Sequence, residues 1–282
     1  MKWLFAAASA AFVWPSTLVG AETHGDDKWR YNLFHPTPED QMREMSTDRP
    51  DQTESAYTVD AGHFQVEMDL VSAVFDRHGE VQTRGWGTSL NLKAGLLNNV
   101  DIQFVLEPYV TIRQKDLQTD AAGTISGFGE FQTRVKVNLW GNDGGKTAMA
   151  IMPFIKWPLA ESDLRNGKTE GGIILPWAVE LPAQWGLGGI VEFDFVSDGG
   201  GGRDTEYFNT IALSRDIVGD LGAYVEFAAL LTPGNGESWQ GQVDLGFTYA
   251  LNKNTQFDFG CNFGVTEAAP DFNPFIGFSW RL

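Results

Sequence analysis

The last forty residues of the chain alternate between apolar and polar positions. Within 242–251 the odd positions are apolar and the even positions are polar or small, and the pattern resumes at 256–265 and at 275–282. Side chains of a β-strand point to opposite faces with a period of two. The pattern therefore predicts three strands, the first two joined by a tight turn at 252–254, with one aromatic-rich face of the kind that contacts lipid.

The same alternation predicts nine further strands upstream. We place them at 64–75, 86–96, 100–113, 130–139, 147–158, 172–181, 185–195, 206–215 and 221–231, which with the last three makes about twelve. Both faces of 147–158 are apolar, so its register stays open. The polar stretch 114–126 is expected to be a long loop.

Connection lengths and aromatic positions extend this picture to a barrel. Turns after even-numbered strands are short and those after odd-numbered strands are generally longer, as in outer-membrane barrels whose termini lie in the periplasm. Aromatic residues fall near the strand ends in two rows, Trp86, Trp157, Tyr207 and Trp239 at one end and Trp140, Trp185, Tyr249 and Trp280 at the other. Aromatic girdles of this kind mark the two membrane interfaces. The expected fold class is all-β, a transmembrane antiparallel β-barrel of about twelve strands.

The N-terminus divides the chain into three parts. Residues 1–21 combine Lys2 with an apolar run and a small-residue site ending at Ala21, which predicts a cleaved signal peptide. Residues 22–61 lack sustained periodicity and form an expected periplasmic N-terminal segment. The expected barrel occupies 62–282.

Composition narrows the class of function. The chain has 20 Lys plus Arg against 37 Asp plus Glu, a net charge of −17, so it would repel nucleic acid. The mean hydropathy of −0.20 is too low for a helical membrane protein but fits a barrel with a wet interior. The single cysteine, Cys261, excludes an intramolecular disulfide and is expected to face lipid.

The polar faces of the strands supply candidate lumen residues. Such charges could line a wet pathway and bias it electrostatically, or they could pair across strands and fill a narrow barrel, and both readings stay open. The candidates are Glu67, Asp69, Lys93, Asp101, Glu107, Arg113, Glu130, Arg134, Lys136, Glu192, Asp194, Glu226, Asp244, Asp258 and Arg281.

The N-terminal segment contains a candidate plug. Arg49, flanked by Asp48 and Asp51, is expected to insert into the barrel mouth and pair with lumen carboxylates, because a polar segment lies beside an acidic interior. The alternative is a solvated periplasmic tail.

Signatures of catalysis and of metal binding are scarce. The four histidines lack metal-ligand spacing, and His78 with Ser126 is the one pair that a hydrolase at the barrel rim could use. We expect no enzyme activity, no cofactor and no metal.

A motif adds a resemblance to this reading. The run 48–55, Asp-Arg-Pro-Asp-Gln-Thr-Glu-Ser, and the later Gly-His-Phe-Gln at 62–65 resemble the opening of the bacterial outer-membrane family assigned to transport in the phenol meta-cleavage degradation pathway. Gln52 stands where that family more often has an aromatic residue. The motif covers about twenty residues, and the resemblance implies an outer-membrane barrel that passes small molecules, aromatic compounds among them.

These observations predict a channel for passive uptake of small molecules across the outer membrane of a Gram-negative bacterium. The alternative is a non-conducting structural or binding barrel. Expected partners are outer-membrane lipid and lipopolysaccharide, a small-molecule solute, and the barrel insertion machinery. An aromatic-rich last strand resembles the signal which that machinery reads, although Leu282 stands where Phe is commoner.

Overall fold

The computed structural model describes residues 25–161, 164, 167–233 and 238–282. Its elements are η1 (Gly25–Arg30), β1 (Phe64–His78), β2 (Val81–Leu97), β3 (Val100–Asp116), β4 (Ala122–Gly127), β5 (Phe131–Trp140), β6 (Thr147–Trp157), β7 (Glu170–Leu181), η3 (Pro182–Gln184), β8 (Trp185–Ser197), β9 (Arg203–Val218), β10 (Leu221–Thr232), β11 (Ser238–Asn252), β12 (Thr255–Gly264) and β13 (Phe272–Arg281). The expected signal peptide lies outside the described residues. Within the described part of the chain, no helix has the length and apolar character needed to cross a membrane.

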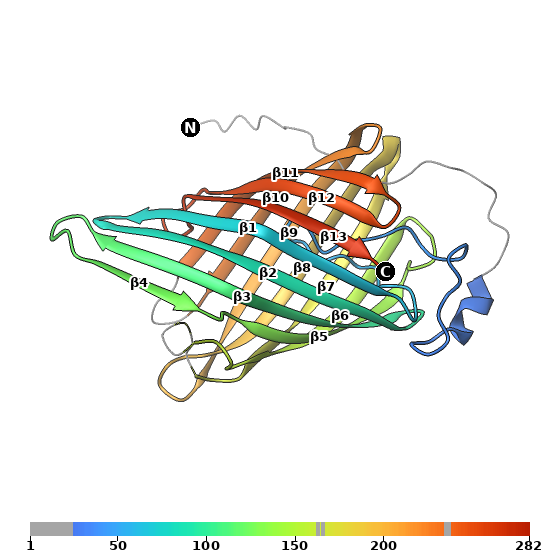
Figure 1. The fold of residues 1–282 in the computed structure, drawn as a ribbon, viewed down its shortest axis with the longest axis horizontal. Coiled ribbons are helices and arrows are strands. Elements are labelled where there is room, and N and C mark those ends of the chain that lie inside the picture. The colour runs from blue at the N-terminus through green and yellow to red at the C-terminus, as the bar shows by residue number, and fades with distance from the viewer. Residues whose placement is uncertain (1–24, 162–163, 165–166, 234–237) are drawn as a thin grey trace.

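The strands close into an antiparallel barrel (Figure 1). Each strand pairs with its neighbours around the ring, and β13 returns to β1, with Gln65 opposite Arg281. Twelve of the thirteen strands form the wall, because β4 pairs only with β3. Closure leaves no free edge in the wall, as a lipid environment requires.

The outer face of the barrel is apolar and carries the predicted aromatic rows. Trp86, Trp157 and Trp239 are exposed at one end of the wall, and Trp140 and Trp280 at the other. Exposed Leu, Ile, Val and Phe side chains lie between the two rows, for example Phe259 on β12. This distribution is the one that a hydrocarbon layer between two interfaces selects.

The inner face is polar on most strands and has an apolar stretch on β6 to β8. On β6 the inward residues are Ala148, Ala150 and Met152, all nearly inaccessible to solvent, which settles the register that the sequence left open. Met152 packs with Ile174 on β7 and Ile190 on β8. An apolar patch therefore lies inside the barrel, on one side of the lumen.

A β-bulge corrects the expected position of one lumen candidate. Leu90 of β2 lies opposite Leu106, but Thr88 lies opposite Tyr109, so β3 contains one extra residue between these pairs. The bulge inverts the alternation of β3 beyond that point. Arg113 consequently lies opposite Arg84 on the outer face, and the prediction that it lines the lumen is wrong.

Two expected loops at the same end of the barrel are ordered as strands. Residues 76–78 and 81–85 extend β1 and β2 to a tight turn at 79–80, and the expected loop 114–126 contains β4, which pairs with β3 from Val110 to Lys115. These extensions project beyond the ends of the other strands on that side of the barrel (Figure 1). Outside lipid they need no apolar face, so hydrophobic periodicity carried no signal for them.

Candidate functional site: the lumen and its N-terminal segment

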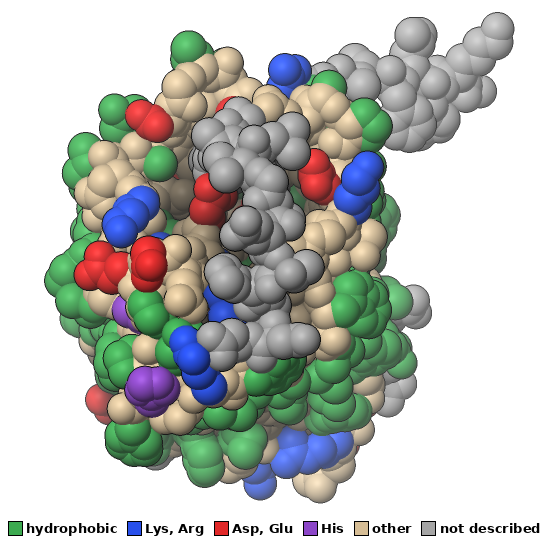
Figure 2. Space-filling model, turned by 90° about the vertical axis from the view of Figure 1, so that its right-hand side faces the viewer, with side chains coloured by type: hydrophobic (Ala, Val, Ile, Leu, Met, Phe, Trp, Pro, Cys, Tyr) green, Lys and Arg blue, Asp and Glu red, His purple; other side chains and the backbone are tan. Residues whose placement is uncertain are grey.

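The N-terminal segment, residues 25–61 in the described part of the chain, enters the barrel at the end with the short turns. Its residues 48–56 contact side chains of β1, β2, β5 and β9 to β12. Figure 2 looks onto this end and shows acidic and basic side chains gathered around its centre, with apolar side chains on the flanks. The segment therefore lies across the lumen.

Arg49 of the segment pairs with two carboxylates of the wall. Its Nη1 lies 2.8 Å from Asp69 Oδ1 on β1, and its Nη2 lies 2.8 Å from Asp258 Oδ1 on β12. The guanidinium also lies over the ring of Phe275, with 5.7 Å from Cζ to the ring centroid. Gly277, opposite Asp258 on β13, leaves the space that the guanidinium occupies.

Asp48 is held by two buried lysines. It pairs with Lys93 on β2 and with Lys136 on β5, where the Nζ to Oδ1 distance is 2.6 Å, and Lys93 also pairs with Glu67. Burial alone would raise the pKa of Asp48, but the charges of Lys136 and Lys93 outweigh it and hold the pKa well below its usual range. Removing one member of such a buried group costs about 3–5 kcal/mol, because the remaining charge loses its partner.

Gln52 and Thr53 bind the acidic side of the lumen. The Gln52 amide N–H donates to Glu226 Oε2 (2.8 Å), its side-chain amide donates to Asp244 Oδ2 (2.7 Å), and the Thr53 hydroxyl donates to Glu226 Oε1 (2.6 Å). Thr53 also shares a short hydrogen bond with Thr210 on β9. These bonds satisfy carboxylates that would otherwise be buried side by side.

Burial destabilises the charged form of two carboxyl groups in the segment. Burial raises the pKa of Glu54 to about 7, against the opposing charge of Arg134, with which it forms an ion pair. Burial and the neighbouring carboxylate of Glu226 raise the pKa of Asp51 well above its usual range. Because both pKa values are raised in the docked state, the segment binds more tightly in the lumen when these two groups carry a proton.

We expect the segment to loosen as pH rises from 6 to 8. A free Glu54 would titrate near pH 4.3, so raising its pKa to about 7 makes docking about tenfold weaker at pH 8 than at pH 6. Channel open probability in planar bilayers should rise correspondingly across this window. Glu54→Gln, which has nothing to titrate, is expected to flatten this part of the profile. A wild-type profile that falls toward pH 8 would contradict the assignment.

Two cavities adjoin the Arg49–Asp69 ion pair. One, of about 600 Å³, is lined by the segment and by residues of β7 to β11, and the other, of about 380 Å³, by residues of β1 to β3 together with Gly129, Glu130 and Leu164. Arg49 lines the first and its partner Asp69 lines the second. The Arg49–Asp69 ion pair therefore stands between the two cavities.

The structure brings most of the lumen candidates together in three groups, and Asp69 pairs with Arg49. Lys93, Lys136, Glu67 and Asp101 lie around Asp48, and Glu226, Asp244 and Asp258 lie around 49–53. Glu107, Glu130, Glu192 and Asp194 lie toward the far end, where Lys156 pairs with Glu130. Arg134 joins Glu54, and Arg281 donates from Nη1 to the Arg43 carbonyl oxygen (2.7 Å). Whether these residues line a conducting pathway stays a prediction.

Sequence reasoning missed the polar partners of the segment's second half. Gln52, Thr53 and Glu54 bind the wall as closely as Arg49 does. The Thr-Glu-Ser that follows Asp-Arg-Pro-Asp in the motif was the available signal for them. Their wall partners Thr210 and Gln242 carry no charge, so nothing in the sequence distinguished them from other inward polar residues.

The residues considered for catalysis or metal binding are not assembled. The hydroxyl of Ser126 shares a 2.7 Å hydrogen bond with that of Thr111, and no contact joins Ser126 to His78 among the described residues. Over the same part of the chain, no group of three or more His, Cys, Asp or Glu residues could hold a metal ion.

Comparison with known proteins adds a family and a fold. The family model described as "Putative MetA-pathway of phenol degradation" matches residues 47–282. An outer membrane channel from Pseudomonas putida F1 is similar in structure, with a TM-score of 0.60 at 9% identity over 84% of this chain and 100% of that chain. The NanC porin is similar with a TM-score of 0.53 at 10% identity over 77% of this chain and 100% of that chain. The search of curated proteins found no match.

Proposed function

The chain belongs to the family described as the putative MetA-pathway of phenol degradation, and we propose that it is a channel for passive entry of small molecules across the outer membrane. The N-terminal segment acts in it as a plug. Its apolar outer face with two aromatic rows supports a place in the outer membrane of a Gram-negative bacterium. Lipid and lipopolysaccharide surround it there, after insertion by the barrel assembly machinery.

The contacts between the segment and the lumen wall carry this proposal. The segment is held to the wall by ion pairs and hydrogen bonds of its side chains, and it lines the larger of the two cavities. Polar contacts of this kind exchange with water at small net cost, whereas a packed apolar core does not. The segment can therefore leave the pathway without unfolding the barrel.

The proposed class of solute rests on the family description and on the apolar residues of the lumen wall. Aromatic or hydrophobic compounds are proposed because the family description names phenol degradation. The inner apolar patch of Met152, Ile174 and Ile190 gives such compounds a surface to move along. The alternative, a non-conducting structural or binding barrel, rests on the same segment remaining in place permanently.

Solute entry into liposomes tests the proposal. We expect liposomes that contain the full chain to swell in arabinose faster than protein-free liposomes, and to swell little in a trisaccharide, since a partly filled barrel of this strand number passes only small solutes. Phenylalanine against glutamine, two solutes of similar size, tests the preference for aromatic compounds. If arabinose entry stays at the protein-free level at both pH 6 and pH 8, the non-conducting alternative holds.

A further inference from the structure

The larger cavity has a composition of its own. It holds about 600 Å³ between the N-terminal segment and the inner faces of β7 to β11, a volume within the usual range of about 300–1,000 Å³ for small-molecule pockets. Met45, Pro50 and Tyr57 line it from the segment, and Tyr224 and Ala250 line it from the wall. Its surface therefore offers apolar and aromatic contact area with polar groups between.

The basic groups around the cavity are already engaged. Arg49 pairs with Asp69 and Asp258, and Arg281 donates to Asn254 Oδ1 (2.9 Å) and to the Arg43 carbonyl oxygen. The remaining basic residues of the lining, Lys28, Arg43 and Lys253, pair with Asp143, with Asp143 and with Glu39. Among the described lining residues, no cation is left to receive an anionic ligand.

Several hydrogen-bond acceptors around the cavity lack a partner. Tyr224 is 4% exposed, and its hydroxyl is buried without a hydrogen-bond partner among the described residues. The hydroxyl of Thr248 on the neighbouring strand β11 is also buried without a hydrogen-bond partner among the described residues. Such groups are uncommon inside proteins and call for a ligand or water. Gly246 lies opposite Tyr224 and leaves the room that its ring needs.

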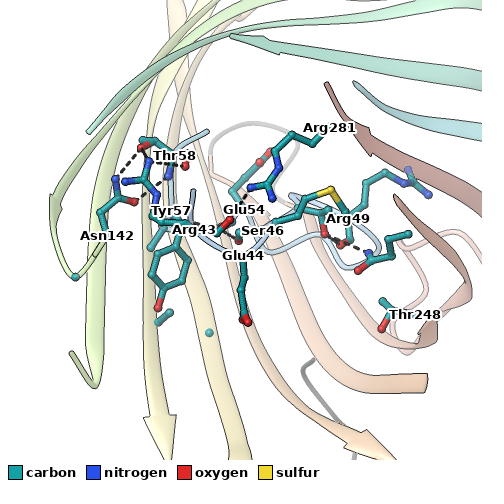
Figure 3. Close-up of a pocket in the computed structure, with 18 of the residues that line it drawn as sticks. Arg43, Glu44, Ser46, Arg49, Glu54, Tyr57, Thr58, Asn142, Thr248 and Arg281 are labelled. Atoms are coloured by element: carbon teal, nitrogen blue, oxygen red, sulfur yellow. Dashed lines mark hydrogen bonds between the residues drawn. The ribbon is translucent and has the colours of Figure 1, made fainter. Parts of the chain in front are cut away.

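Two carboxyl groups complete the acceptor set. Glu44 forms no hydrogen bond or ion pair with any described residue, and Figure 3 shows its side chain pointing the same way as Tyr57, away from the polar cluster around Thr58 and Asn142. Asp51 also lines the cavity. A cation entering the cavity would be attracted by the ionised form of either carboxyl group.

We propose that the cavity between the N-terminal segment and β7 to β11 binds a small organic cation, a protonated amine that carries an aromatic or aliphatic ring. Carboxylates attract the ammonium, the hydroxyls accept its hydrogen bonds, and tyrosine rings favour cations over their faces. The apolar lining takes the ring of the ligand. A carboxylate of the same size would meet carboxylates and no free base.

Binding of three probes of one size tests the ligand class. Benzylammonium, benzyl alcohol and benzoate at pH 7 differ in charge but share the ring, and isothermal titration of the purified full chain in a non-ionic detergent measures each. We expect benzylammonium to bind at least about tenfold more tightly than benzyl alcohol, equivalent to about 1.4 kcal/mol, and benzoate not to bind. Equal affinity for the three would overturn the proposed class.

Substitutions test the place of binding. Tyr224→Phe, which keeps the ring, and Glu44→Gln are each expected to weaken benzylammonium binding several-fold, whereas Glu267→Gln in the loop between β12 and β13 leaves it unchanged. Ala250→Phe or Ala178→Phe, which fill the cavity from two different strands, should abolish it, with heat-dependent gel mobility reporting the folded barrel. If either cavity-filling variant folds and still binds benzylammonium as the wild type does, the proposed binding site is wrong. The titration measures no flux, so its result is separate from that of the proposed channel.

Discussion

Deleting residues 22–55 is expected to convert a barrel with rare, small openings into a pore that stays open in planar bilayers. The deletion removes Asp48, Arg49, Gln52, Thr53 and Glu54, which together bridge the wall from β1 to β12. A barrel of this strand number is wider than its own side chains fill, so the emptied lumen holds water. We expect the single-channel conductance to rise by about tenfold or more, because the segment is the main obstruction in the lumen.

A shorter deletion supplies the control. Removing residues 22–30 takes away η1 but keeps every contact that 48–56 makes with the lumen, so its conductance should remain that of the full chain. The wall itself does not depend on the segment, since each strand is paired on both sides. Unchanged conductance after the longer deletion would rule out a plug, because it would show that residues 22–61 do not obstruct the conducting pathway.

The barrel could be predicted from sequence because lipid imposes a rule on every second residue. Alternation of Phe257, Phe259 and Phe263 with Asp258 and Asn262 has one physical explanation when it recurs around a closed sheet, and the closing pair of first and last strands followed from it. The rule ceases where lipid ends. Beyond the aromatic row β4 and the tip of the β1–β2 hairpin face water on both sides, and there the pattern carried no information.

The sequence predicted the kind of charge inside the barrel, but it did not predict which residues would lie in contact there. Arg49 could be expected to find carboxylates because the inward faces are acidic, and the structure pairs it with Asp69 and Asp258. Which carboxylates it would find depends on the register of strands far apart in sequence, which local pattern does not fix. Arg113 failed for a related reason, since a single inserted residue in β3 reversed every side chain beyond it.

Glycine positions in the lumen carry information that the alternation did not use. Gly277 interrupts the inward polar row of β13 beside Asp258, and the space it leaves is filled by the guanidinium of Arg49. Gly188 on β8 is also inward, but a methyl group there would make only ordinary contacts, 3.6 Å from Thr53 Cγ2. Alanine substitutions at these two glycines therefore distinguish a specific effect on Arg49 from a general effect of adding a methyl group to the lumen wall.

Gly277→Ala is therefore expected to open the channel by displacing Arg49. The new methyl group would overlap the guanidinium, so Arg49 loses its bonds to Asp69 and Asp258. Hydrogen bonds between charged groups contribute about 1.5–3 kcal/mol each, and the loss of about 3 kcal/mol raises the open population by about a hundredfold. Single-channel open probability measures this change, and Gly188→Ala, the matched inward glycine, should leave it at the wild-type level.

Arg49→Ala should produce a similar increase, and the double variant Arg49→Ala, Gly277→Ala should open no further than either single variant. This non-additivity is the signature of two substitutions that act on one interaction. If Gly277→Ala opened the channel as strongly without Arg49 as with it, the methyl group would be distorting β13 itself. In the expected case, the space at Gly277 and the charge of Arg49 act together, because both are needed for the ion pairs that hold the segment to β1 and β12.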